Sequence, residues 1–600
     1  METGSIDTAA LPTFTPDHWH PGAASLDLHG ARVTVQAPEG TVELTGNQNI
    51  VLVAATEPVE LTVRLDVPLG DAAGYWHPDA GWHRTLPADW SPWRAVSLID
   101  SAPAGVLYDT HGKAQLAFAA DRTVQQTAVR FGVSEEHKRF GVWLRCRLTP
   151  DTPLRIRLAV PRRTLATALR ELRDWYATLP GHSPLPTPEF GRTPVYSTWY
   201  AFTQDVNAAD VEREAELAAE LGCGQLYLDD GWQLHASGRG YSGCGDWRAD
   251  PAKFPDLAAH VAAVRELGLR YSAWIAPLLL GERSAAHAEW ARLAPHYNRT
   301  LDCRILDPRH AEVREHIVRG CREVVERYGL DGLKIDFLDE AAAAYTGAPL
   351  PDELGAGYLH DVGQAMAALL TRLREELHAL RGDEFVIELR QPYTGPAMTA
   401  FGNQLRACDC PADPVANRIR TLDIALLAPG GAAHSDMLMW DPKATPVAVA
   451  RQLHGALHSV PQLSARLSEL SPLHRRTLAF WLTTWRELRE VLLGGHYEPG
   501  RPDELYPQIT ARHGDRLVVT SFTDRPAPLT TTGWRSLTLV NASAARRLLL
   551  DVSGPTRRVR LAVFDAAGRP QPGLALVMTP GLHAVAVPPG GLCRVLEDAE

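Results

Sequence analysis

Three stretches in the middle of the chain decide the fold: RYSAWIAP (270–277), VREHIVRGCREVVERYG (313–329) and LKIDF (333–337). The first and the last are short apolar segments, whereas the middle one carries apolar residues at helical spacing. A strand, an amphipathic helix and a second strand in this order are typical of a parallel sheet with a helical crossover.

The same alternation extends over residues 194–490. Helical spacing recurs at 206–222, 255–268 and 363–381. Including the strands RYSAWIAP and LKIDF, there are eight strand candidates: VYSTW (195–199), QLYLDD (225–230), RYSAWIAP, LKIDF, FVIELR (385–390), QLRACD (404–409), HSDMLMW (434–440) and SVPQLS (459–464). Eight strands with helices between most of them predict a central (β/α)₈ TIM barrel.

Both flanks of this region have the alternation of antiparallel strands, as in TVELTG (41–46) and VELTVRLDV (59–67). A helix at 162–180 and a Gly/Pro-rich linker separate the N-terminal part from the barrel. We therefore predict a multidomain protein with three parts, listed by residue: an N-terminal β-sandwich with a linker helix (1–185), the barrel as catalytic domain (190–495) and a small C-terminal antiparallel β-sandwich (500–600).

The stretch YWHPDAGWHRTLPADWSPW (75–93) contains four tryptophans. These side chains either fill a core or an interface, or form a lid on which a sugar ring stacks, because flat aromatic faces suit the C–H faces of sugars. The sequence leaves both interpretations open.

Composition excludes several classes of protein. A net charge of −11, without a block of like charges, argues against a nucleic-acid partner. No apolar run is long enough for a membrane span, and the start METGSIDTAALPTF lacks a secretion signal. The eight cysteines form no CxxC pair and are interpreted as reduced thiols, so we expect a cytoplasmic protein.

In a (β/α)₈ barrel the active site lies at the carboxyl ends of the strands. These ends carry carboxylates, cations and tryptophans: Trp199, Asp229, Asp230, Trp274, Lys334, Asp336, Glu388, Arg390, Arg406, Asp409, His434 and Asp436. Such groups bind hydroxyl-rich ligands, and two carboxylates from different strands can flank a glycosidic bond. Lys334 lies two residues before Asp336, on the same side of the strand, where its charge is expected to keep Asp336 ionised.

Two plainer interpretations of these strand-end residues compete with a sugar-binding site. An aspartate at a strand end is often the N-cap of the next helix, and for Asp229 or Asp256 taken alone this is equally favoured. A metal site is the other. No HxH or HExxH motif appears, and the charge of Lys334 would oppose a cation, so we expect no metal and no cofactor.

The motifs YLDDGWQ (227–233), GDWRADPAKFPD (245–256), WIAP (274–277), LDPRHAEVREHI (306–317) and LKIDF resemble, in order and spacing, the α-galactosidases of glycoside hydrolase family 36. More widely they resemble the clan of retaining α-glycosidases that includes family 27. The resemblance covers residues 190–490, and the flanking sandwiches match the family layout. It implies a retaining α-galactosidase that acts on a small oligosaccharide or another α-glycoside.

The resemblance also implies a role for each matched residue. Asp336 matches the nucleophile and Lys334 the neighbouring lysine that contacts substrate hydroxyls. The other matched residues bind or line the substrate site: Asp229 and Asp230 the O4 and O6 hydroxyls, Trp199 and Trp274 the walls, Arg406 the region near O2, and Asp436 the lining. Arg390 is predicted to bind substrate from its place at the end of strand five alone. Asp409 matches the acid/base carboxylate.

The sequence departs from the family at three places, and one of them is Ala276, which stands where the family has the Glu of a W-x-E-P segment. Arg406 and Asp409 are three residues apart where the clan has four, so Asp413 is a rival acid/base, although Asp409 lies closer to the strand end. The strand-five segment is ELRQPYTG (388–395) instead of a Cys-Ser-Ser-Gly-Gly-like run, and this segment is expected to read the 2-substituent of the sugar. Three alternatives therefore stay open: another α-linked sugar, transglycosylation, and a non-catalytic sugar-binding barrel. The sequence leaves the oligomeric state open, a homo-oligomer included.

Overall fold

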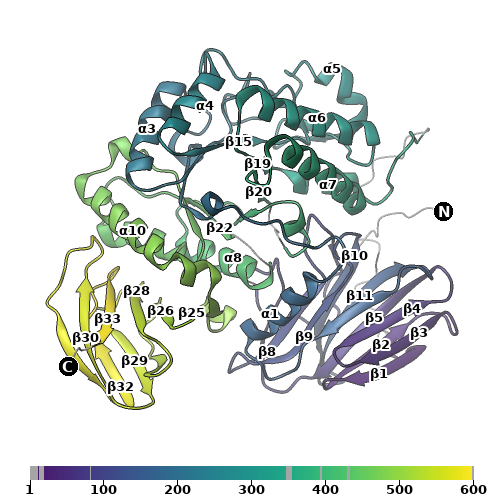
Figure 1. Cartoon of the computed structure of the whole chain (residues 1–600). Helices are drawn as coiled ribbons and strands as arrows, with labels where there is room; N and C mark the ends of the chain where they lie inside the picture. The colour runs from purple at the N-terminus through teal and green to yellow at the C-terminus, as the bar shows by residue number, and fades with distance from the viewer. Residues whose placement is uncertain are drawn as a thin grey trace.

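The structure is a computed structural model that describes residues 11, 19–81, 83–345, 354–391, 395–428 and 433–597. Its three parts follow the chain: two N-terminal sheets, a central barrel and a C-terminal pair of sheets (Figure 1). The predicted fold class is confirmed. Within these described residues, no helix is long and apolar enough to cross a membrane.

The barrel is closed and all of its strand pairs are parallel. Its strands are β13 (Val195–Ser197), β14 (Gln225–Leu228), β15 (Arg270–Ile275), β19 (Gly332–Asp336), β20 (Val386–Arg390), β21 (Gln404–Arg406), β22 (Ala433–Leu438) and β23 (Val460–Leu463). Each lies within or overlaps one of the eight predicted stretches.

Helices surround the barrel: α3 (Ala208–Glu220), α4 (Leu257–Glu266), α6 (Ala311–Tyr328), α7 (Val362–Arg381), α8 (Pro414–Leu427), α9 (Pro446–Gly455) and α10 (Pro472–Gly494). Their starts follow from local chemistry. Asn207 and Asp256 cap α3 and α4 by accepting a hydrogen bond from a backbone N–H of the first turn. At the far end of α6, Gly329 takes a φ of 68°, the left-handed conformation that ends a helix at low cost.

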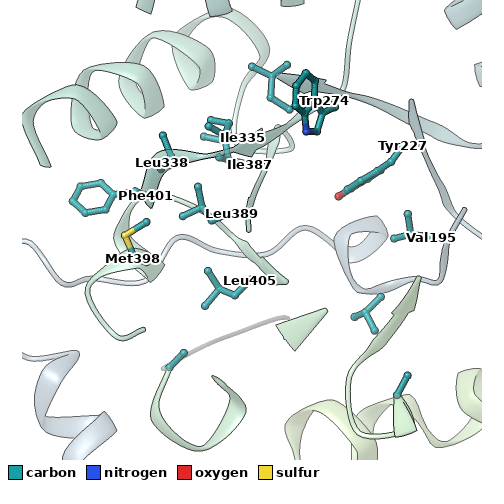
Figure 2. Close-up of a cluster of buried hydrophobic side chains, with 14 of the residues drawn as sticks. Val195, Tyr227, Trp274, Ile335, Leu338, Ile387, Leu389, Met398, Phe401 and Leu405 are labelled. Carbon is teal, nitrogen blue, oxygen red and sulfur yellow. The ribbon is translucent and has the colours of Figure 1, made fainter. Parts of the chain in front are cut away.

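Alternation along the barrel strands separates an apolar layer from a polar one. In β19, Leu333 and Ile335 belong to the apolar core, whereas the buried residues between and after them are Lys334 and Asp336. Figure 2 shows Ile335 gathered with Ile387, Leu389 and other apolar side chains. Because successive side chains point to opposite faces of a strand, the apolar layer fixes the strands while the polar residues point into the barrel.

The N-terminal part contains two six-stranded sheets, in the orders β1-β2-β5-β11-β10-β7 and β3-β4-β12-β9-β8-β6. Every strand pair in them is antiparallel. The strands are β1 (Ala24–Leu28), β2 (Ala31–Gln36), β3 (Val42–Asn47), β4 (Ile50–Ala55), β5 (Val59–Pro68), β6 (Ala72–Trp76), β7 (Arg94–Val96), β8 (Ala104–Asp109), β9 (Ala114–Ala120), β10 (Thr127–Ser134), β11 (Arg139–Leu148) and β12 (Leu154–Leu158). The linker helix α1 (Leu165–Tyr176) packs against β9 and α8.

The C-terminal part is a smaller sandwich with its own apolar core. Its seven-stranded sheet has the order β24-β25-β26-β28-β33-β30-β31, and its three-stranded sheet β27-β29-β32. The strands are β24 (His496–Glu498), β25 (Gln508–His513), β26 (Arg516–Ser521), β27 (Ala527–Thr530), β28 (Ser536–Asn541), β29 (Leu548–Ser553), β30 (Arg557–Phe564), β31 (Leu574–Met578), β32 (Gly581–Val585) and β33 (Leu592–Glu597). Two pairs, β26 with β28 and β27 with β29, are parallel in an otherwise antiparallel sandwich.

One buried carboxylate, Asp423 on α8, joins all three parts. Trp76 donates its indole N–H to Asp423 Oδ1 (2.8 Å), and the Tyr506 hydroxyl, from the C-terminal side of the barrel, donates to the same oxygen (2.5 Å). Arg84 forms an ion pair with Asp423 Oδ2 (2.5 Å). Trp76 therefore fills an interface, as one interpretation of the tryptophan-rich stretch predicted. Trp90 is 55% exposed, and Trp82 lies outside the described residues.

Replacing Asp423 by Ala is expected to destabilise the protein by about 3–5 kcal/mol, because it leaves Arg84 buried without its partner charge. The free energy of the first unfolding transition in urea measures this. Asp383→Ala is the matched control, since that side chain is fully exposed, and it should change the same quantity by less than about 0.5 kcal/mol. Equal effects of the two substitutions would contradict a joining role for Asp423.

Candidate active site

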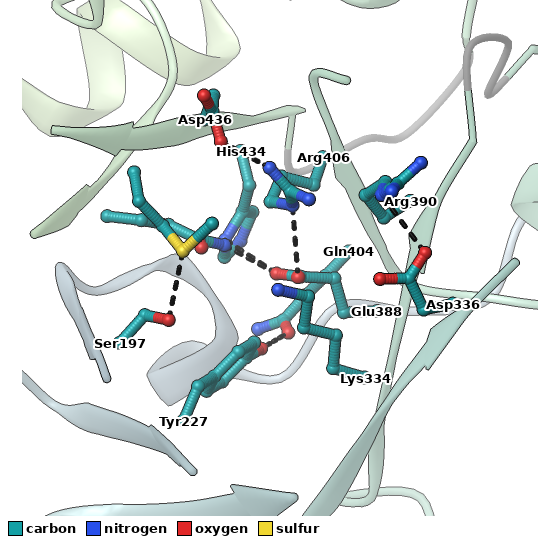
Figure 3. A network of polar contacts seen from close by, with 12 residues as sticks. Ser197, Tyr227, Lys334, Asp336, Glu388, Arg390, Gln404, Arg406, His434 and Asp436 are labelled. Atoms are coloured by element: carbon teal, nitrogen blue, oxygen red, sulfur yellow. Dashed lines mark hydrogen bonds and ion pairs between the residues drawn. The ribbon is translucent and has the colours of Figure 1, made fainter. Parts of the chain in front are cut away.

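The polar residues predicted from the strand ends come together at the carboxyl end of the barrel (Figure 3). They form two sets of ion pairs: one joins Lys334 on β19 to Asp229 at the end of β14, and the other, built on Arg390 and Arg406, joins strands β19, β20, β21 and β22. Most of these side chains are buried, so each charge depends on the partner that the barrel provides.

Lys334 pairs with Asp229 across the barrel. Asp229 also accepts a hydrogen bond from the Ser197 hydroxyl (3.2 Å). The prediction that Lys334 is the cation beside Asp336 is therefore wrong in detail. Both side chains point into the barrel, but the long lysine side chain reaches Asp229, directly after β14, so its charge acts on that aspartate instead.

Asp336, the predicted nucleophile, has a different set of partners. Arg390 Nε lies 3.0 Å from Asp336 Oδ1, and the Trp274 indole N–H donates to Asp336 Oδ2 (2.9 Å). The backbone N–H of Phe337 donates to Oδ1 (2.7 Å), and Phe337 has a φ of 56°, which a non-glycine residue rarely adopts. Two side chains and one backbone group thus hold this carboxylate in one orientation.

Arg406 is the centre of a cluster with three carboxylates. It is fully buried and contacts Asp409 (2.7 Å), Asp436 (2.5 Å) and, at 3.6 Å, Glu388. Burial raises the pKa of Asp436 and Glu388, the latter to about 7, although Arg406 acts in the opposite direction on both. Burial has the same tendency for Asp409, but there Arg406 and Arg390 outweigh it and hold the pKa well below its usual range.

Asp230 is held by amides rather than by a cation. Gln204 and Gln233 each donate to one of its oxygens (2.7 Å in both cases), and burial raises its pKa to about 6. The neighbouring Gly231 has a φ of 120°, and a Cβ there would lie 2.6 Å from the Cα of Gln204. Only glycine allows this close approach of two loops, which places Gln204 on Asp230.

One of the five lysines of the chain, Lys253, holds the loops around Gln204 and Gly231 together. Lys253 Nζ donates to the backbone carbonyls of Gln204 (2.8 Å), Gly231 (2.8 Å) and Ala236 (2.7 Å). Three carbonyls in this arrangement suit the three N–H donors of an ammonium group better than the planar fork of an arginine.

The rival carboxylates of the strand-six region lie in different environments. Asp413 is the N-cap of α8, and its Oδ1 accepts from the backbone N–H groups of Val415 (3.0 Å) and Ala416 (2.9 Å). Asp409 is 38% exposed at the side chain and contacts Arg406 and Arg390. Of the two, Asp409 is therefore the one that faces Asp336 through a shared arginine.

The two predicted tryptophans differ in setting. Trp274 is buried, and Tyr241 stacks against it with ring centroids 6.0 Å apart. Trp199 is the first residue of a short helix, α2 (Trp199–Phe202), directly after β13, and Arg239 lies over its ring at 5.7 Å. Trp274 thus orients Asp336, while the half-buried Trp199 remains available to a ligand.

Sequence reasoning missed several polar neighbours. Tyr200 donates its hydroxyl hydrogen bond to Asp436 (3.1 Å), and Gln462 donates to Glu388 (2.5 Å). Gln204 was missed as well. For Tyr200 and Gln462 the available signal was their place directly after, or inside, a predicted strand, which is weaker than that of an aspartate pair; Gln204 lies in a loop, five residues past the strand.

The described side chains include no group of three or more His, Cys, Asp or Glu placed to hold a metal ion. What they offer is a pair of carboxylates on different strands, several hydrogen-bonding groups and aromatic walls. On the carboxyl face of a (β/α)₈ barrel, this is the arrangement expected of a glycoside hydrolase.

Comparisons with known proteins agree with this class. Residues 189–361 match the Melibiase family model. Alpha-galactosidase 2 of Pediococcus pentosaceus is 28% identical over 213 residues, which are 33% of this chain and 27% of that protein. The alpha-galactosidase of Escherichia coli is 29% identical over 116 residues, 18% of this chain and 16% of that protein.

Solved structures share the whole architecture. The GH36 alpha-galactosidase AgaA of Geobacillus stearothermophilus superposes with a TM-score of 0.63 at 16% identity, over 96% of this chain and 84% of that one. The alpha-galactosidase TtGalA of Thermus thermophilus has a TM-score of 0.53 at 19% identity, over 76% of this chain and 94% of that one. These likenesses show a shared fold.

The resemblance to α-galactosidases of glycoside hydrolase family 36 is thus confirmed: residues 189–361 match the Melibiase model, and the chain shares the fold of a solved GH36 α-galactosidase. The matched segment spans only about a quarter of the first curated relatives, 27% of one and 22% of the next. The activity of the whole protein is accordingly a matter of proposal.

The raised pKa of Glu388 predicts that the stability of the protein depends on pH. Its pKa is about 7 in the folded protein, above the ordinary value of 4.5, so the folded state holds a proton that the unfolded state has lost. Stability should fall as pH rises from about 4.5 to 7, by about 1.4 kcal/mol for each unit of the shift.

Glu388→Gln should remove that loss. Its stability relative to the unmodified protein, measured by denaturant unfolding from pH 5 to pH 8, should improve as pH rises. Glu384→Gln, at an exposed position in the turn before β20, is the matched control and should show a flat difference. A flat difference for Glu388→Gln would contradict the raised pKa.

Proposed function

We propose that this protein is a retaining α-glycosidase that hydrolyses terminal α-galactosides, with Asp336 as nucleophile and Asp409 as acid/base. One observation carries the proposal. Arg390 Nε contacts both carboxylates, at 3.0 Å from Asp336 Oδ1 and 3.7 Å from Asp409 Oδ1, so the two groups can be no farther apart than these contacts laid end to end. Carboxyl groups of retaining enzymes stand about 5–5.5 Å apart, closer than those of inverting enzymes.

The chemistry follows from this pair. Asp336 attacks the anomeric carbon while Asp409 donates its proton to the aglycone oxygen, which leaves as an alcohol, and this gives a β-linked glycosyl-enzyme. Asp409 then takes a proton from a water molecule, which attacks the same carbon and releases Asp336. Two inversions leave the α configuration unchanged.

The remaining residues suit a sugar ring. Asp229 and Asp230 lie on one side of Asp336 as paired acceptors for two hydroxyl groups, with Lys334 beside Asp229 as a donor. Arg406 and Asp436 occupy the opposite strands, and Trp199 offers an aromatic face. Related AgaA variants are described in complex with raffinose and stachyose, which favours an oligosaccharide or another small α-galactoside here.

Asp336→Ala should abolish turnover of p-nitrophenyl α-galactoside, a loss of at least about 10⁴-fold, while the free energy of unfolding shows that the protein remains folded. Asp413→Asn is the matched control, because an asparagine oxygen caps a helix as well as an aspartate oxygen does, and it should keep both the stability and the catalytic rate. Near-normal hydrolysis by Asp336→Ala would refute the nucleophile assignment.

The product anomer is a separate prediction. Proton NMR of the first product should show α-galactose before mutarotation. A first product of β configuration would mean an inverting mechanism and would exclude Asp336 as a covalent nucleophile.

A second function is favoured by Arg390 in the unusual strand-five segment. An arginine beside the nucleophile changes which 2-substituent fits, so another α-linked sugar or a transglycosylation reaction is the alternative. A panel of aryl α-glycosides decides between them: a larger kcat/KM on a non-galactoside would displace galactose. Location in the cytoplasm and homo-oligomer formation stay predictions.

A further inference from the structure

A cavity of about 280 Å³ lies between the N-terminal part and the barrel. Its described walls come from the loop after β6, from Asp100 after β7, from the segments directly after β20 and β21, and from α8. None of the residues assigned to the reaction or to the hydroxyl groups of the sugar is among these described wall residues. The cavity is therefore separate from the candidate active site, although it adjoins two of the strand ends that build that site.

Two charged side chains in these walls, Asp100 and Arg420, have no ion-pair partner among the described residues, and they are not paired with each other. Asp100 accepts a hydrogen bond from the Ser97 hydroxyl (2.8 Å), and burial raises its pKa. Arg420 of α8 donates through Nη1 to the backbone carbonyls of Cys408 (2.8 Å) and Asp409 (2.7 Å). An acceptor and a donor on different walls can therefore each take a further partner.

The segment after β20 adds a buried amide to the walls. Gln391 is 1% exposed, and neither polar atom of its amide has a hydrogen-bond partner in the part of the chain that the structure describes. Its neighbour Arg390 pairs with Asp336 inside the barrel, whereas Gln391 belongs to the wall of the cavity. A buried amide without partners costs stability, so a polar ligand in the cavity is the partner that the fold itself does not provide.

These groups suit a ring that carries several hydroxyl groups. A hydroxyl both donates and accepts hydrogen bonds, so such a ring can donate to Asp100, accept from Arg420 and do both with Gln391. Ile424 and Leu427 of α8 supply apolar wall for its C–H groups. An anion would meet three carboxylates in the described walls, and a cation would meet the arginine. The volume lies near the lower limit of about 300 Å³ for small-molecule pockets, which favours one ring over a chain.

We propose that this cavity is a second binding site, for a neutral ligand with several hydroxyl groups and the size of one sugar ring, and that its occupant acts on Asp409 through Arg420. The guanidinium that binds the ligand also holds the carbonyls of Cys408 and Asp409. A ligand that fixes Arg420 therefore fixes the backbone that carries the proposed acid/base. The binding site stands apart from the proposed function, whereas its action on Asp409 rests on that function.

Thermal unfolding of the whole protein with D-glucose as the probe tests binding. Glucose should raise the temperature of the first unfolding transition, because a ligand that binds only the folded state stabilises it. Asp100→Ala should weaken binding about 10-fold, as expected for a lost hydrogen bond to a charged group, and should show a smaller rise at each concentration. Asp121→Ala is the matched control, since this carboxylate also has a pKa raised by burial but lies outside the cavity, and it should keep the full rise. Equal rises in all three proteins would overturn the inference, because glucose would then act elsewhere or as a general cosolute.

Gln391→Leu separates a ligand-binding amide from one that the fold needs. Leucine replaces the amide by an apolar group of similar size, so the free protein should be at least as stable as the unmodified one. Its rise in unfolding temperature with glucose should nevertheless be smaller. An undiminished rise in this variant would count against the site.

Cys408 reports where the glucose binds. It lines the cavity, and of the eight cysteines, all of which the structure describes, it alone is not buried. Glucose should slow its alkylation by N-ethylmaleimide, measured by mass spectrometry of the peptide that contains it. Asp100→Ala should need about 10-fold more glucose for the same protection. Protection that is unchanged in Asp100→Ala would place the glucose outside this cavity and overturn the inference.

Kinetics test the action on Asp409. Glucose should raise kcat for p-nitrophenyl α-galactoside about fivefold, the lower end of the usual coupling between two sites, at the concentrations that protect Cys408. A rise in KM at constant kcat would mean binding in the active site, and an equal rise of kcat in Asp100→Ala would mean that glucose acts as an acceptor; either result would overturn the action on Asp409. If the protein cleaves no aryl α-galactoside, the proposed function fails, while the unfolding and alkylation results still decide whether the cavity binds the probe.

Discussion

Charge buried at the mouth of the barrel is the constraint on which the rest of the structure depends. A carboxylate removed from water needs a cation or several N–H donors, and otherwise it takes up a proton. Lys334 meets this need for Asp229, and Arg390 meets it for Asp336. Each pair joins different strands, so the charges are satisfied only when the barrel is closed in its observed register. The barrel must therefore close in this register before the buried charges of the site can be paired.

The sequence predicted the scaffold well because its signals are local. Alternation with a period of two marks strands, helical spacing marks the helices between them, and both are read within about ten residues. The strand ends then followed from the barrel itself, which places Asp229, Asp230, Asp336 and Asp409 on one face. The parallel pairs of the C-terminal sandwich were missed, because strand direction depends on connections that periodicity does not describe.

Pairing could not be predicted, because it is decided by distance across the barrel and not by separation along the chain. Lys334 stands two residues from Asp336 but bonds to Asp229, which is 105 residues away. Capping gives a similar lesson. Asp256 and Asp229 looked alike as strand-end or helix-start aspartates, yet the first caps α4 and the second binds a lysine. Only the fold distinguishes a carboxylate that caps a helix from one that pairs with a buried cation.

Asp423 has a consequence for how the chain is made. Arg84 lies 339 residues before its carboxylate partner Asp423, and Tyr506 follows 83 residues after Asp423. At a synthesis rate of about 5–20 residues per second, roughly 20–70 s pass between the synthesis of Arg84 and that of Asp423. The residues of this junction are thus complete only once Tyr506 has been made, after every strand of the N-terminal sandwich and before strands β25 to β33 of the C-terminal one. The order of translation therefore sets the order in which the contacts of Asp423 can form.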